Sequence, residues 1–284
     1  MKLAFLCPLW GSEHLPFETF LRKARDAGYD GVEVAFPNDR GQCREMVAQL
    51  EESELLYVAQ HWDTFTTDFD AHQRQFYGRL EQLAETQPLF INSHTGRDHF
   101  IISQNLALLS GADKLSAELG LPIYHETHRG RFNFACHVTA EYLALKPDLK
   151  LTADFSHWCC VAESLLQDQE EAMQKAIEHS FHVHCRVGHI QGSQVIDPAL
   201  PVYAETLARH LQWWRAIAEA AQARGQALLT LTAEFGPAPY MLPHPDRDGP
   251  IADQWAHNCW IMERVRRELQ SFDTAAAPYA NAQA

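Results

Sequence analysis

Four apolar segments in the second half of the sequence end in, or carry near their end, a side chain that can ionise. They read PIYHE (122–126), LKLTAD (149–154), FHVHCR (181–186) and ALLTLTAE (227–234), and the side chains are Glu126, Asp154, His184 and Glu234. Within each segment polar and apolar residues tend to alternate, which is the side-chain period of a β-strand. The four side chains are therefore expected to point the same way at the ends of four successive strands.

Three carboxylates aimed at one point would repel each other strongly, because like charges in a desolvated site cannot all ionise cheaply. A divalent cation among them removes that conflict. Ligation by oxygen and one nitrogen, without cysteine, favours Mn, Mg, Co or Zn over a metal that prefers sulfur. We therefore expect one divalent metal ion held by Glu126, Asp154, His184 and Glu234.

The elements that would position these groups repeat along the whole chain. Short apolar runs, each typical of a buried strand, occur at 2–7, 31–36, 55–60, 88–93, 122–126, 149–154, 181–186 and 227–234. Segments with helical periodicity lie between and after them, at 16–28, 41–53, 70–85, 103–119, 138–146, 162–178, 204–224 and 253–270. Eight strand–helix units in one chain predict a (β/α)8 TIM barrel, in which the active site lies at the carboxyl ends of the strands.

The domain organisation follows from the same pattern. No linker rich in Pro or Ser separates the two halves of the chain, so residues 1–270 are predicted to form a single barrel domain. The end of the sequence, TAAAPYANAQA, has low complexity and no periodicity. We expect residues 271–284 to be a flexible C-terminal tail.

Composition excludes several classes of protein. The 284 residues are 46% hydrophobic and carry a formal net charge of -14, which disfavours nucleic acid as a partner. Seven cysteines without a CxxC pair do not form a disulfide framework and fit a reducing, cytoplasmic location. The start, MKLAFLCPLWGSE, is typical neither of a signal peptide nor of a membrane span.

The motifs together resemble the xylose isomerase-like TIM barrel superfamily, which includes sugar isomerases and epimerases, hydroxypyruvate isomerases, inosose dehydratases and endonuclease IV. The resemblance covers about residues 1–270, and the motifs that carry it are DAGYDGVEV, SHTG, HETH, DFSH, HVHCR and AEFG. The family's metal ligands come from strands 5 to 8 as Glu, Asp, His and Glu. They match the four residues predicted above, and the HVHCR motif selects His184 over His182.

The resemblance implies proton transfer next to the carbonyl of a small sugar, polyol or hydroxy-keto acid, by way of an enediolate. Glu126 and Glu234 would remove and return the proton, and His157 of the DFSH motif would contact a substrate oxygen or a second metal. Relatives often assemble as dimers or tetramers, so the resemblance also implies a homo-oligomer. It implies no membrane partner.

Further residues at the strand ends are predicted to bind substrate, and they are His61, His94, His128 and Arg186. For His61 and His94 the alternative is plain packing, and for His128 it is an exposed loop. Arg186 either holds an acidic substrate group or neutralises the neighbouring carboxylates. Glu33 and Trp10 follow early strands and could also line the pocket, although a tryptophan there often belongs to the core.

Two other activities share part of this pattern. A dehydratase of the inosose or dehydroshikimate type would begin with the same proton abstraction and then expel water. An endonuclease IV-like phosphodiesterase needs a DxH pair after the seventh strand, where Asp197 is instead followed by Pro198 and Ala199. Xylose isomerases proper carry a lysine two residues after the strand 5 glutamate, where this chain has His128.

Overall fold

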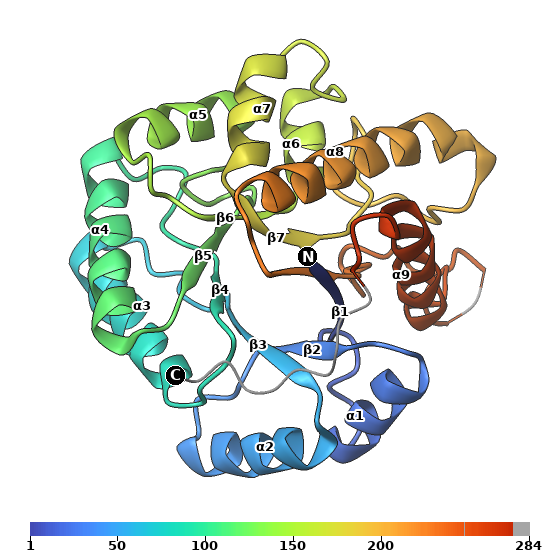
Figure 1. Ribbon diagram of the computed structural model, residues 1–284, viewed down its shortest axis with the longest axis horizontal. Helices are drawn as coiled ribbons and strands as arrows, with labels where there is room; N and C mark the ends of the chain where they lie inside the picture. Colours follow the sequence, from blue (N-terminus) through green and yellow to red (C-terminus); the bar gives the residue numbers. More distant parts are fainter. Residues whose placement is uncertain (247, 275–284) are drawn as a thin grey trace.

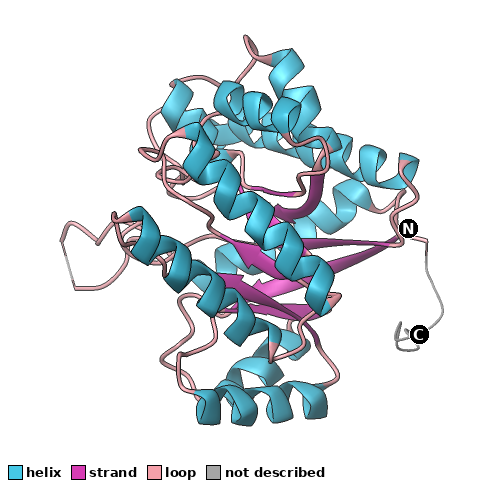
Figure 2. Ribbon diagram, turned by 90° about the vertical axis from the view of Figure 1, so that its left-hand side faces the viewer, coloured by secondary structure: helices cyan, strands magenta, loops and turns pink. Residues whose placement is uncertain are grey.

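A computed structural model describes residues 1–246 and 248–274, and it confirms the predicted barrel. Eight parallel strands close into a ring, and helices surround them (Figure 1). The strands are β1 Lys2–Pro8, β2 Gly31–Val34, β3 Leu56–His61, β4 Ile91–Ser93, β5 Ile123–Glu126, β6 Leu151–Ala153, β7 Ser180–His184 and β8 Leu228–Thr232. Figure 2 shows the strands at the centre with helices packed outside them.

Helices connect successive strands, so each crossover brings the chain back parallel to itself. They are α1 Phe17–Asp26, α2 Arg40–Ser53, α3 Phe69–Ala84, α4 Ile102–Leu119, α5 Cys136–Leu145, α6 Ser156–Ala162, α7 Glu170–Glu178, a 3-10 turn η1 Pro201–Tyr203, α8 Ala204–Ala223 and α9 Gln254–Leu269. Among the described residues, none of these helices combines the length and the apolar character needed to cross a bilayer.

Side-chain alternation separates two layers of the core. Phe5 of β1 lies opposite Leu231 of β8, and both belong to the large buried cluster that packs the strands against the helices. Inside the barrel a small apolar cluster contains Phe90, and the ring of His182 lies 5.0 Å from it. The polar groups at the carboxyl ends of the strands therefore rest on an apolar floor.

The predicted helix at 162–178 is wrong in part. Helix α6 begins at Ser156, shortly after β6, and ends at Ala162, because the next residue, Glu163, has a left-handed φ of 49°. Leu166 also has a positive φ, and α7 starts only at Glu170. The apolar residues of this stretch suit a helix, but two left-handed residues break it. The consequence for the site is that His157 lies in a short helix at the strand ends.

The start of the predicted tail lies within the described residues. Phe272 is buried, Asp273 accepts a hydrogen bond from the backbone of Leu3 at 3.1 Å, and Thr274 donates one to Met1 at 3.0 Å. These contacts join the end of the last helix to the first strand. The remaining part of the predicted tail, 275–284, lies outside the described residues.

Candidate active site

The structure brings together the four residues predicted to bind a metal. Glu126 and His184 are the last residues of β5 and β7, Asp154 follows β6 directly, and Glu234 lies two residues beyond β8. One potential ligand atom from each of the four lies within 4.8 Å of the corresponding atoms of the other three, and all four side chains are buried. We call these residues the quartet. They meet because the parallel strands of the barrel all end at one face, around a common axis.

The contacts of His184 fit a shared ligand position better than a hydrogen bond. Its Nδ1 lies 2.6 Å from Glu234 Oε2 and 3.5 Å from Glu126 Oε2, yet Nδ1 makes no hydrogen bond. Ligand atoms that each lie about 2.1 Å from one cation approach each other to about 3 Å without a proton between them. The donor set and its spacing therefore fit a divalent cation.

Glu33 of β2 lies behind His184, on the side away from the quartet. The Nε2 atom of His184 is 3.0 Å from Glu33 Oε2, and Thr232 donates a hydrogen bond of 2.5 Å to the same oxygen. Asn92 donates to the other oxygen of Glu33 at 2.9 Å. Burial alone would raise the pKa of Glu33, but His184 and a hydrogen bond from His182 lower that pKa well below its ordinary value.

This arrangement fixes the orientation of the imidazole. A carboxylate that accepts the Nε2 proton leaves Nδ1 as the free ligand atom, as in many metal-bound histidines. Glu33 is not among the residues that line the cavity, although its place at the end of β2 suggested pocket lining. Strand alternation predicts that Glu33 points inward, but it does not reveal that its partner comes from β7, far along the chain.

Arg186 lies between two members of the quartet. Its guanidinium donates to Asp154 Oδ2 at 3.0 Å and to Glu234 Oε2 at 2.7 Å. Burial would lower the pKa of Arg186, but Glu234 and Asp154 raise it. The guanidinium balances one of the three carboxylates of the quartet, and the negative charge that remains favours a divalent cation.

The protonation of Asp154 depends on this balance of charges. Burial raises its pKa, Arg186 lowers it and Glu234 raises it again, and the outcome is a pKa of about 6 against the ordinary 3.8. Binding of a cation requires the ionised carboxylate. Cation affinity is therefore expected to fall as the pH drops below this value.

Three histidine rings pack in series beside the quartet. The ring centroids of His94 and His128 are 4.4 Å apart, and those of His128 and His157 are 3.9 Å apart. His94 Nε2 lies 2.9 Å from Glu126 Oε2, and His128 donates from Nδ1 to the Arg129 carbonyl at 2.6 Å. His94, Glu126 and His128 form a second group whose ligand atoms are close enough to hold a cation.

His157 is fully buried beneath His128 and Tyr240, and neither of its ring nitrogens has a hydrogen bond. Its Nε2 lies 3.6 Å from Asp154 Oδ2. Burial, and then His128, lower the pKa of His157 well below its ordinary value, so the ring is neutral. It does not line the cavity.

His61 does not reach the cavity either. Its Nδ1 is hydrogen-bonded to Ser93 at 2.9 Å and its Nε2 to Thr64 at 2.8 Å, and the side chain is fully buried. Both ring nitrogens are therefore bonded inside the protein, one to the end of β4 and the other to the loop that follows β3. Of the four residues predicted to bind substrate, His94, His128 and Arg186 line the cavity.

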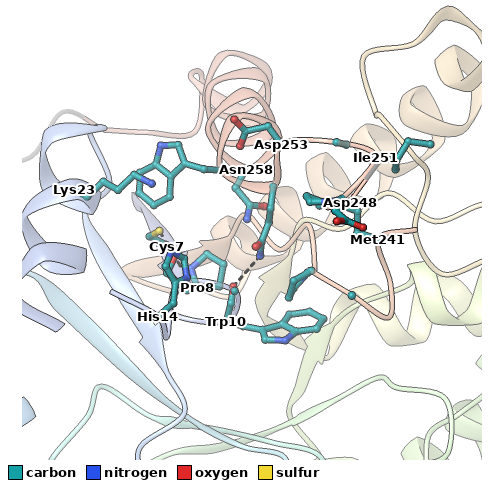
Figure 3. A pocket seen from close by; sticks show the side chains of 18 residues that line it. Cys7, Pro8, Trp10, His14, Lys23, Met241, Asp248, Ile251, Asp253 and Asn258 are labelled. Atoms are coloured by element: carbon teal, nitrogen blue, oxygen red, sulfur yellow. Dashed lines mark hydrogen bonds between the residues drawn. The ribbon is translucent and has the colours of Figure 1, made fainter. Parts of the chain in front are cut away.

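The cavity above the quartet has a volume of about 580 Å³. Glu126 and Glu234 belong to its wall, whereas Asp154 and His184 lie beneath it. A cavity of about 690 Å³ lies to one side, between the loops that follow β1 and β8 (Figure 3). That larger cavity contains no member of the quartet, and Lys23 lies over the ring of Trp255 in it. The chemistry is therefore expected in the smaller cavity.

Comparison with known proteins points to the fold. No family model and no curated protein matches the sequence. A xylose isomerase-like TIM barrel protein from Mycobacterium smegmatis, solved with magnesium, matches at a TM-score of 0.65 and 11% identity, over 95% of this chain and 98% of that one. This chain shares the (β/α)8 barrel fold of that protein.

Two further solved structures of similar fold are named as enzymes. The 3-keto-D-glucoside 4-epimerase of E. coli matches at a TM-score of 0.59 and 14% identity, over 94% of this chain and 100% of that one. A probable 3-DHS dehydratase of Bacillus anthracis matches at a TM-score of 0.54 and 17% identity, over 84% of this chain and 94% of that one. At these identities the likeness describes the fold, and the activity must be argued from the site.

Proposed function

We propose that this protein is a divalent-metal-dependent isomerase or epimerase that moves a proton next to the carbonyl of a small sugar, polyol or hydroxy-keto acid. One observation carries the proposal. The quartet converges at the strand ends, and only Glu126 and Glu234, the two residues suited to move a proton, reach the cavity wall. The 3-keto-D-glucoside 4-epimerase with the same fold supports a carbohydrate substrate.

The cation would be held by Nδ1 of His184 and by carboxylate oxygens of Glu126, Asp154 and Glu234. When bound, it supplies Lewis-acid stabilisation of the negative charge that develops on the carbonyl oxygen. Because three of the four ligands are carboxylates, the set suits Mn, Mg, Co or Zn. Glu33 would hold the imidazole ring in the orientation that this binding needs.

Proton transfer falls to the two glutamates. Burial would raise the pKa of Glu126, but His94 and His184 lower it below its ordinary value, so this carboxylate is ionised at neutral pH. One glutamate takes the proton from the carbon next to the carbonyl. In an isomerase the proton then returns to the former carbonyl carbon while the neighbouring hydroxyl group loses its proton; in an epimerase the other glutamate, in its protonated form, gives a proton to the opposite face of the same carbon. The substrate passes through an enediolate between the two steps.

The remaining polar groups on the wall are assigned to the substrate. His94 and His128 offer ring nitrogens beside Glu126, and Arg186 offers the one strong positive charge beside Glu234. His157 supports the ring of His128 from below and acts through it. The wall also contains the rings of Trp10 and Tyr240, which suit the C–H faces of a carbohydrate.

The test is proton exchange. The protein is loaded with Mn, its bound metal is measured, and ketoses, inosose and hydroxypyruvate are incubated with it in heavy water. We expect deuterium to enter at the carbon next to the carbonyl of at least one compound. Glu126→Gln and Glu234→Gln should each reduce the exchange rate by about 10²- to 10⁴-fold, as for the loss of a general acid or base. Glu13→Gln, at an exposed carboxylate on the same cavity, is the matched control.

Two outcomes would contradict the isomerase proposal. If both glutamine variants bind Mn like the parent and no carbonyl compound exchanges a proton, the proposed chemistry is wrong. If an unsaturated product and water appear instead, the protein is a dehydratase, which the dehydratase of the same fold makes the principal alternative.

A further inference from the structure

The loop after β3 presents two large aromatic side chains to solvent at the mouth of the cavity. Trp62 is 46% exposed and Phe65 is 50% exposed, and both line the cavity of about 580 Å³. Their ring centroids are 5.7 Å apart with the planes at 67°. Among the described residues, these are the only aromatic side chains that are both large and exposed. An exposed aromatic pair in a concave wall is typical of a ligand-binding surface.

The backbone of this loop is held by buried side chains. Arg131 is 3% exposed and donates to the carbonyls of Trp62 at 2.7 Å and Thr64 at 3.0 Å. His61 binds the Thr64 hydroxyl at 2.8 Å. These contacts place the two residues on either side of Asp63 in a fixed position.

The flanking residues of the loop are anchored as well. Arg79, also buried, forms an ion pair with Asp63 at 3.3 Å, and His72 donates to the Thr66 carbonyl at 2.9 Å. The guanidinium carbon of Arg131 lies 5.1 Å from the ring centroid of Phe65. Two buried arginines and two buried histidines thus fix a short segment whose two aromatic side chains face outward.

Such rigidity has a physical consequence for binding. A ligand that meets a preformed aromatic surface does not have to order the loop, so less free energy is lost on binding. If the loop served only to connect β3 with α3, burial of Trp62 and Phe65 would be favoured, because aromatic surface that stays in water contributes no free energy of burial to the fold. The anchoring therefore indicates that these rings are kept available for a ligand.

The cavity offers room for such a ligand next to the reacting group. Its volume of about 580 Å³ lies within the range of about 300–1,000 Å³ found for sites that enclose drug-sized molecules. The same wall contains Phe36, Trp10 and Tyr240, and the last two are packed edge to face at 5.2 Å. Glu126 and Glu234, the two quartet members that reach the cavity, therefore share its wall with five aromatic side chains.

We propose that Trp62 and Phe65 form a subsite for a second ring, so that the substrate is a glycoside or other conjugate rather than a free monosaccharide. The shared chemistry of an aryl group and a sugar ring is a flat face of C–H bonds that stacks on aromatic side chains. The proposal rests on the proposed function, because that function assigns the reacting hydroxy-carbonyl unit to the Glu126 and Glu234 part of the same cavity.

The test compares ligands that differ only in the second ring. Binding of phenyl and methyl β-D-glucopyranosides, the matching galactosides and mannosides, and cellobiose is measured by titration calorimetry and ligand-observed NMR. We expect at least one ring-bearing compound to bind about 10-fold more tightly than its methyl counterpart, as two aromatic contacts would provide. Preference for the phenyl compounds or for cellobiose distinguishes an aryl group from a second sugar.

Variants locate the effect. Trp62→Ala and Phe65→Ala should each remove most of this preference and leave the affinity for the methyl compound unchanged, whereas Trp62→Phe should retain it. Because both side chains are exposed, truncation should leave the fold intact, which circular dichroism verifies. Leu145→Ala, an equally exposed apolar side chain at the end of α5 and outside the cavity, is the matched control.

The proposal is wrong if no ring-bearing compound binds more tightly than its methyl counterpart, or if the preference survives in both alanine variants. Proton exchange, measured in parallel, separates this result from the proposed function. A ring preference without exchange would keep the subsite and overturn the isomerase. Exchange without a ring preference would keep the isomerase and overturn the subsite.

Discussion

His184 at the centre of the barrel and His210 in helix α8 are both fully buried, yet their surroundings differ completely. His210 donates from Nδ1 to the Thr206 carbonyl at 2.9 Å and accepts at Nε2 from the Gly188 backbone at 3.2 Å. His184 has a carboxylate beside each nitrogen, Glu33 at 3.0 Å and Glu234 at 2.6 Å. Burial lowers the pKa of His210 to about 4, whereas the carboxylates overcome burial and raise the pKa of His184 well above its ordinary value.

The difference teaches that the charge of the partners, and not burial, separates a structural histidine from a candidate ligand in this chain. A ring whose two nitrogens meet neutral partners is satisfied as it stands. His61 belongs to this kind, since its two ring nitrogens are hydrogen-bonded to the hydroxyl groups of Ser93 and Thr64. His125 is bonded through Nδ1 to the hydroxyl group of Thr95. A ring surrounded by carboxylates marks a place where positive charge is required, and a divalent cation can supply it.

The largest effect is expected from a matched pair of substitutions at the two histidines. His184→Asn should abolish measurable Mn binding and proton exchange, because it removes the one nitrogen ligand and the ring that lies between Glu33 and Glu234. His210→Asn should leave Mn affinity within about 2-fold and lower only the free energy of unfolding, by about 1–3 kcal/mol. Calorimetric titration with Mn and urea unfolding measure the two quantities.

Equal losses of Mn affinity in both variants would show that His184 acts only through the stability of the fold. Unchanged Mn binding in His184→Asn would remove this residue from the metal site. Either result would mean that His184, like His210, is a structural residue and not a metal ligand.

A smaller effect should come from the carboxylate behind His184. Glu33→Gln keeps the shape of the side chain but removes the negative charge that orients the ring, so Mn affinity should fall about 10- to 100-fold. Glu33→Asp, which retains the charge, should recover part of that loss. Glu13→Gln, at an exposed carboxylate of the cavity, should change Mn affinity by less than about 2-fold.

A Glu33→Gln protein that binds Mn as tightly as the parent would contradict this role. The Nε2 proton of His184 provides a second measurement, since its NMR signal should sharpen and shift downfield only while Glu33 accepts it. Loss of Mn affinity without a change in that signal would assign Glu33 to stability instead of orientation.

Much of the fold and the meeting of the quartet could be predicted from the sequence. Eight repeats with a side-chain period of two fix which residues point inward, and barrel closure then brings the ends of β5 to β8 together. The helix predicted at 162–178 failed because Glu163 and Leu166 adopt left-handed conformations, which the apolar pattern does not report.

Contacts between elements far apart in the chain could not be predicted from the sequence. Glu33 meets His184 across the barrel, and Arg131 holds the backbone of the loop that carries Trp62 and Phe65. Both contacts join residues far apart in the chain whose side chains could each have had several neighbours of suitable chemistry. His61 illustrates the same limit, because its position at a strand end predicted a pocket residue while its two hydroxyl partners hold it beneath the wall.

The smallest effect is a difference in the sign of pH dependence. For His210 the folded-state pKa of about 4 lies below the ordinary 6.5, so the neutral ring stabilises the fold above pH 6.5, and that contribution is lost as the pH falls toward 4. Between pH 7 and pH 5.5 the loss amounts to about 1 kcal/mol. Urea unfolding at the two pH values should therefore show the stability difference between the parent and His210→Asn shrinking by about that amount.

For His184 the folded-state pKa is raised, so its contribution is present below pH 6.5 and is lost as the pH rises through the higher value. In the presence of a chelator, the stability difference between the parent and His184→Asn should therefore shrink as the pH rises, opposite to His210. The same sign for both variants would mean that the carboxylates around His184 do not hold it in the charged form. The charges around His184 would then give no reason to expect a cation at that position.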